Sequence, residues 1–82
     1  AAAGGQVELV ERTVSARERA EQWFDRALSL ETADPAAAQS AYRRVLELDP
    51  CDPAAYANLG RLLHEAGDLA GAEAVYAQAL TH

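Results

Sequence analysis

The sequence predicts an all-α fold of about four antiparallel helices joined by short loops. Alanine dominates the hydrophobic half of the composition, and alanine has the highest helix propensity. Apolar residues recur every three or four positions along four segments, which is the spacing of one buried helix face. The start and stop signals leave only short connections between these segments, and such loops force neighbouring helices to run antiparallel.

The first expected helix begins near Ser15 and ends near Glu31. Ser15 and Glu18 have the S-x-x-E spacing of a capping box, in which each side chain binds a free backbone amide near the other. The residues before Ser15, 1–14, contain a Gly-Gly pair and a short apolar patch, so we expect a flexible tail or linker there. The apolar stripe of this helix consists of Ala16, Ala20, Trp23, Phe24, Ala27, Leu28 and Leu30.

Asp-Pro pairs mark the starts of the second and third helices. Asp34 and Asp52 can accept hydrogen bonds from the first free amides, and proline is tolerated at the first helical position. Pro50 ends the second helix, Gly67 caps the end of the third, and Asp68 caps the start of the fourth. The expected inward-facing residues are Ala38, Ala41, Tyr42, Val45 and Leu46, then Tyr56, Leu59, Gly60 and Leu63, then Leu69, Ala72, Val75, Tyr76, Ala79 and Leu80.

A shift of 34 residues superimposes the second helix on the fourth. The matched pairs are Ala38 with Ala72, Tyr42 with Tyr76, Val45 with Ala79, and Leu46 with Leu80. Residues 51–82 resemble a regular unit of the tetratricopeptide repeat (TPR) family, a helical hairpin with this period. The motifs that carry the resemblance are Tyr56-x-x-Leu59-Gly60-x-x-Leu63, Gly67-Asp68, and Ala72-x-x-x-Tyr76-x-x-Ala79-Leu80.

Residues 15–50 resemble a degenerate unit of the same family. The second helix and Pro50 fit, but the same shift places polar residues at the signature positions of the first helix. Moving the first helix by about five residues restores an apolar match, with Phe24 near Leu63. The resemblance therefore implies a TPR-like domain over residues 15–82, with about four helices in a right-handed stack.

The resemblance implies a non-catalytic module that binds a partner protein or peptide, because TPR units share packing residues and differ in partners. In this family the first helix of each hairpin lines a concave groove that binds extended peptides. On the third helix this points to Asn58, Arg61 and Glu65, with His64 at the margin. The first helix carries a similar polar stripe at Arg19, Gln22 and Arg26.

If the two stripes align, three of the seven basic residues face one groove, and an acidic or C-terminal peptide is the expected ligand. The absence of lysine disfavours the carboxylate clamp of chaperone-binding members. A solvated helix face is the other interpretation of these residues. The adjacent aromatic residues Trp23 and Phe24 have two interpretations as well, as core of the first helix or as a lateral contact or dimer surface.

A narrower resemblance gives an alternative role. AYRRVLELDP and NLGRLLHEAGDLAGAEAVYAQAL resemble TPR regions that follow a MerR-type winged-helix DNA-binding domain in some bacterial transcription regulators. This implies a regulatory or dimerising C-terminal part of such a protein. The absence of methionine fits a piece of a longer chain. Two repeats leave apolar faces uncovered, so we also expect self-association or further repeats.

Composition argues against several other classes. The net charge of −6 disfavours direct nucleic-acid binding, and the sequence holds no apolar run long enough to cross a membrane. The motifs of hydrolases, metalloproteases and P-loop proteins are missing, so we expect no catalysis, no cofactor and no metal. Cys51 is the only cysteine, which excludes an internal disulfide and favours a reducing, cytoplasmic location.

Overall fold

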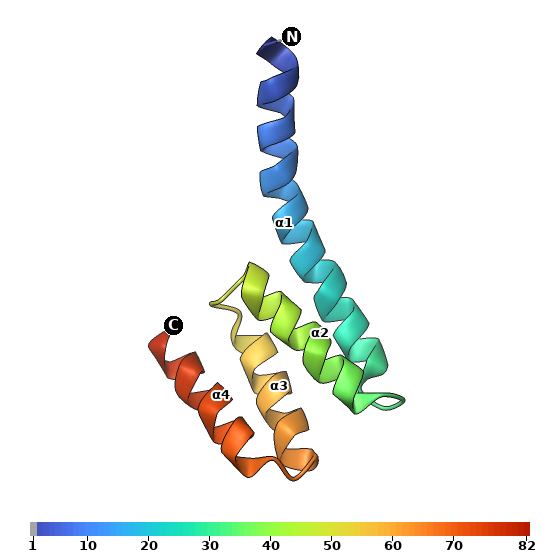
Figure 1. The fold of residues 1–82 in the computed structure, drawn as a ribbon, viewed down its shortest axis with the longest axis vertical. Coiled ribbons are helices and arrows are strands. Elements are labelled where there is room, and N and C mark those ends of the chain that lie inside the picture. Colours follow the sequence, from blue (N-terminus) through green and yellow to red (C-terminus); the bar gives the residue numbers. More distant parts are fainter. Residues whose placement is uncertain (1) are drawn as a thin grey trace.

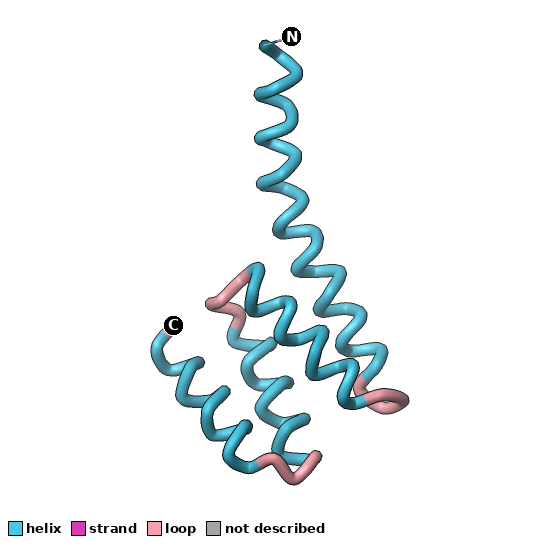
Figure 2. Tube along the Cα trace, viewed as in Figure 1, coloured by secondary structure: helices cyan, strands magenta, loops and turns pink. Residues whose placement is uncertain are grey.

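A computed structural model describes the backbone of residues 2–82 and the side chains of residues 15–82 (Figure 1). The helices are α1 (Ala2–Leu30), α2 (Pro35–Leu48), α3 (Pro53–Glu65) and α4 (Leu69–Thr81). Each helix packs mainly against its neighbours in the sequence, so α1–α2 and α3–α4 form hairpins that stack through α2 and α3. Within this part of the chain, helices and turns are the only elements (Figure 2), and the all-α hairpin prediction is confirmed.

Aspartates cap the last three helices as the sequence predicts. The Asp34 carboxylate accepts a hydrogen bond from the Ala37 amide at 3.1 Å, and Asp68 accepts one from Gly71 at 2.9 Å. Asp52 accepts two such bonds, at 3.0 and 3.2 Å, from the first amides of α3. Each carboxylate satisfies amides that have no partner inside the helix, so these three starts are determined locally.

Gly67 ends α3 in a left-handed conformation, with a φ of 84°. Its amide donates to the His64 carbonyl at 3.0 Å, and the Asp68 amide donates to the Leu63 carbonyl at 2.9 Å. This pair of bonds is the Schellman motif, and it requires a positive φ that glycine adopts without steric cost. The same turn therefore ends α3 and supplies the cap of α4.

Helix α1 begins at Ala2 rather than near Ser15, so the capping box predicted for Ser15 and Glu18 is wrong. Residues 2–14 contain no proline, and each glycine costs only about 1 kcal/mol relative to alanine, which does not prevent a helix. The backbone of 2–14 is helical where a tail was expected, and Figure 1 shows it projecting past α2. Its role as a linker stays a prediction, and residue 1 lies outside the described residues.

The core lies along the two inner helices, α2 and α3. Its largest fully buried side chains are Tyr42, Val45 and Leu59. Four residues predicted to face inward are instead exposed: Leu28 (50%), Leu69 (56%), Tyr76 (44%) and Leu80 (90%). Three of these lie on α4, because α4 is an outer helix and packs mainly against α3. Burial therefore follows the position of a helix in the stack as well as its pattern.

Small residues allow the two helices of each hairpin to approach. Gly60 is buried in α3, and a Cβ at this position would overlap the ring of Tyr76. Ala27 is fully buried in α1. A shift of 33 residues places Trp23 on Tyr56, Ala27 on Gly60 and Leu30 on Leu63. The first hairpin therefore fits the repeat with a one-residue adjustment, in place of the five residues predicted.

Candidate partner-binding site

A groove of about 660 Å³ lies where α1, the end of α2 and the start of α3 meet. Successive turns of α1 supply one wall, since residues spaced by three and four share a helix face. The end of α2 and the capped start of α3 supply the other. The lining residues are Arg17, Ala20, Glu21, Phe24, Asp25, Leu48, Asp49, Asp52 and Ala54.

Phe24 forms the aromatic part of the groove floor. Its ring packs edge-on against Tyr42, with ring centroids 5.4 Å apart and planes at 75°. Phe24 stays half-buried, so part of the ring is available to a ligand. Edge-to-face aromatic pairs add about 0.5–1.5 kcal/mol beyond the buried area, which fixes the orientation of α1 on α2.

The edge of the groove is negatively charged. Four carboxylates line it, from Glu21, Asp25, Asp49 and Asp52, against the single guanidinium of Arg17. Two of these carboxylates also bind backbone amides, because Asp52 caps α3 and Asp49 accepts from the Cys51 amide at 3.2 Å. The excess of carboxylates favours a cationic partner at this groove.

A polar network joins the α1–α2 turn to α3. The Tyr42 hydroxyl donates to the Glu31 carboxylate, and the Asn58 amide donates to that hydroxyl at 3.1 Å. Arg61 donates to Glu31 as well and to Glu65 at 3.2 Å. The network ties the two hairpins together across residues that are distant in the sequence.

The network shifts the pKa of three groups. Burial and the hydrogen bond to Glu31 raise the pKa of Tyr42 to about 12. Burial alone would raise the pKa of Glu31, but the hydrogen bonds from Tyr42 and Arg61 outweigh it and lower that pKa. The hydrogen bonds to Glu31 and Glu65 raise the pKa of Arg61. The carboxylate and the guanidinium are therefore held in their charged forms.

The two predicted polar stripes do not face one groove. Arg19, Gln22 and Arg26 line a separate hollow on α1 together with Trp23. The contact between Phe24 and Tyr42 sets the rotation of α1, and at 100° per residue it turns the stripe away from α3. The predicted arginine-lined groove is therefore wrong, because Arg61 is the only one of its three arginines in the network.

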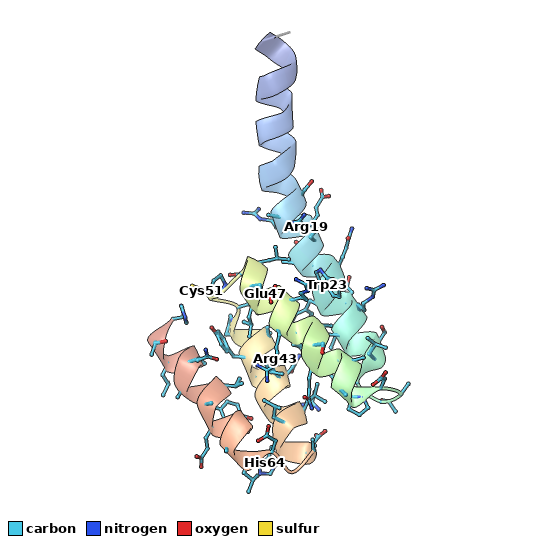
Figure 3. The ribbon with its side chains drawn as sticks, in the orientation of Figure 1. Arg19, Trp23, Arg43, Glu47, Cys51 and His64 are labelled. Carbon is cyan, nitrogen blue, oxygen red and sulfur yellow. The ribbon has the colours of Figure 1, made fainter. Side chains whose placement is uncertain are left out.

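The remaining predicted residues of α3 lie apart from the acidic groove. Asn58 and Arg61 are engaged by Tyr42 and Glu31, and Glu65 is paired with Arg61. His64 is exposed in the last turn of α3, next to the α3–α4 turn (Figure 3). A role in partner binding stays a prediction for these four residues.

Trp23 and Phe24 point to different surfaces. Whereas Phe24 lines the acidic groove, Trp23 lies in a hollow of about 400 Å³ between α1 and α2. The guanidinium carbons of Arg26 and Arg44 lie 5.1 and 5.8 Å from the Trp23 ring centroid, within cation–π distance. The rest of the lining consists of Leu30, Ala37, Ser40 and Ala41. We call this surface the Trp23 hollow.

The stacked hairpins, the capped turns and the groove beside α1 and α3 define a helical-hairpin repeat protein. The tetratricopeptide repeat family model matches residues 29–81, which is more than half of the chain. The chain therefore belongs to the tetratricopeptide repeat family, a family of protein-interaction modules. No curated protein and no solved structure matches the chain. None of the helices in residues 2–82 is long and apolar enough to cross a membrane.

Proposed function

We propose that this chain is a non-catalytic interaction module that holds an extended partner segment in the groove between α1 and α3. The observation that carries the proposal is the half-buried Phe24 ring on a groove floor between three helices. Aromatic residues in such positions dominate the binding energy of protein interfaces. The stripe on α3 is a weaker candidate, since a ligand there would compete with the internal bonds of Asn58 and Arg61.

The groove fits a segment in which a large apolar side chain is flanked by lysine or arginine. The apolar side chain would pack on Phe24 and Ala20, and the cations would meet Glu21 and Asp25. The sequence-based expectation of an acidic ligand depended on arginines that the structure places on another surface. Exposed charges of this kind are screened by salt, so binding weakens as ionic strength rises.

Two probe peptides test this proposal by fluorescence anisotropy. One carries phenylalanine flanked by arginines, and the other carries phenylalanine flanked by glutamates. We expect the basic probe to bind more tightly, and the double variant Glu21→Arg, Asp25→Arg to weaken its binding by about tenfold. Glu73→Arg changes the same kind of charge at an exposed site on α4 and serves as the control. Tighter binding of the glutamate probe would contradict the proposal.

The regulatory or dimerising role in a bacterial transcription regulator stays a prediction from the sequence alone. It concerns the parent protein rather than the groove. A winged-helix domain encoded upstream of Ala1 in the gene would support it, and its absence there would argue against it.

A further inference from the structure

The outer face of α4 is apolar and exposed. Leu69, Tyr76 and Leu80 have exposed fractions of 56%, 44% and 90%. With Glu73 they are spaced by four, three and four residues, so all four share one helix face. Neither α4 nor Asp68 before it contributes a positively charged residue to this face.

The equivalent face of α2 is covered within the chain. The 34-residue shift relates Tyr76 to Tyr42 and Leu80 to Leu46. Tyr42 is fully buried, and Leu46 is partly buried against the core. Leu46 faces a hollow of the second hairpin that is formed by Tyr56, Leu59 and Gln78. The internal junction therefore shows how a leucine of this face packs on the next hairpin.

The first hairpin presents the same kind of hollow at the opposite end of the stack. The shifts of 33 and 34 residues relate Trp23 to Tyr56, Arg26 to Leu59 and Arg44 to Gln78. These three residues line the Trp23 hollow, which contains no carboxylate among its lining residues. Figure 3 shows Trp23 on α1, at the opposite side of the stack from α4.

We propose that the Trp23 hollow binds α4 of a second copy of this chain, with Leu80 placed as Leu46 is placed at the internal junction. The charges agree, because the hollow is flanked by Arg26 and Arg44 while the α4 face carries Glu73. The two surfaces differ, so the contact is heterologous and joins copies head to tail. Arginine stands at the place of Leu59, so this contact is weaker than the internal junction and depends on concentration.

The only tryptophan of the chain reports on this contact directly. We expect sedimentation velocity to show growing oligomers as the concentration rises from about 1 µM to about 1 mM. Tryptophan emission should shift to shorter wavelength over the same range, since Trp23 leaves water. A monomer throughout, or association without any change in emission, would overturn the proposal.

Complementation of two variants tests the head-to-tail geometry. Leu80→Glu removes the leucine of one surface, and Trp23→Ala removes the floor of the other. We expect each variant alone to be monomeric and an equal mixture to form a dimer, because one intact surface remains on each. Two results contradict the geometry: a mixture that stays monomeric, and a variant that still associates alone.

Two further variants keep this test independent of folding. Trp23 is half-buried, so Ser40→Arg offers a second way to block the hollow from an exposed position. Leu28→Glu is the matched control for Leu80→Glu, because Leu28 is also an exposed leucine but lies on another helix. We expect Leu28→Glu to associate like the parent chain, and circular dichroism should show that all variants are helical. Loss of association in Leu28→Glu would count against the proposal.

Discussion

Tyr42 and Tyr76 occupy the same position in the two hairpins, yet their surroundings differ. Tyr42 is fully buried, packs against Phe24 and hydrogen-bonds to Glu31 and Asn58. Tyr76 lies over Gly60 and is 44% exposed. The two residues have the same side chain on the same kind of helix, so the difference arises from α3, which follows the first hairpin and covers it. Burial at this position is a property of the junction between hairpins.

The largest expected effect tests this difference directly. Tyr42→Ala should lower the free energy of unfolding by about 3–5 kcal/mol, as for other buried aromatic residues. This is a large fraction of the stability of a small domain. Tyr76→Ala should cost about 1 kcal/mol or less in the monomer, because much of its ring already contacts water. Urea denaturation at low protein concentration measures both. Equal losses would show that the hairpin alone determines the role of this tyrosine.

A smaller effect concerns the carboxylate that only the first hairpin places against its tyrosine. Glu31→Ala should lower the free energy of unfolding by about 1–2 kcal/mol at neutral pH, since Tyr42 and Arg61 lose an acceptor. The folded-state pKa of Glu31 is lowered, so its contribution is present above the ordinary value of 4.5 and is lost as the pH falls through the lowered pKa.

Unfolding curves of the parent chain and of Glu31→Ala at neutral and acidic pH measure this contribution. The difference between the two should shrink as the pH falls. Glu47→Ala is the control, because the Arg44–Glu47 pair is exposed and such pairs contribute about 0–1 kcal/mol. A difference for Glu31→Ala that stays constant with pH would mean that the ionised carboxylate contributes nothing.

The smallest expected effect concerns the turn of the second hairpin. Gly67→Ala should lower the free energy of unfolding by about 1 kcal/mol, because alanine is strained at a φ of 84°. Gly67→Asn should lose less, since asparagine tolerates this conformation. The space around Gly67 is open, so the conformation and not a clash decides the result. Thermal unfolding of the two variants compares them, and equal stability of parent and Gly67→Ala would contradict this account.

The helix starts and turns could be predicted from the sequence because their signals are local. Asp34, Asp52 and Asp68 bind amides within three residues of themselves, and Gly67 closes its turn with its own neighbours. The start of α1 could not be predicted in the same way. The Ser15–Glu18 spacing is compatible with a cap and also with a helix interior, and nothing nearby excludes the longer helix.

The candidate site was less predictable, because it depends on contacts between distant residues. The spacing on α1 correctly grouped Arg19, Gln22 and Arg26, but spacing does not state which neighbour a face meets. That choice follows from the packing of Phe24 on Tyr42. The pairing of Arg61 with Glu31 joins residues from different hairpins, and no motif in the sequence indicates it. The acidic groove has a sequence signal in Glu21 and Asp25, which lie on one α1 face with Phe24.

The order of the helices in the stack has a consequence for the rate of folding. Over residues 2–82 each helix packs mainly against the next one along the chain, so most contacts close short loops. Chains with such local contacts fold in microseconds to milliseconds, faster than β-rich chains of similar length. Because α2 and α3 hold most of the core, we expect these two helices to pair first and the outer helices to add to them in turn.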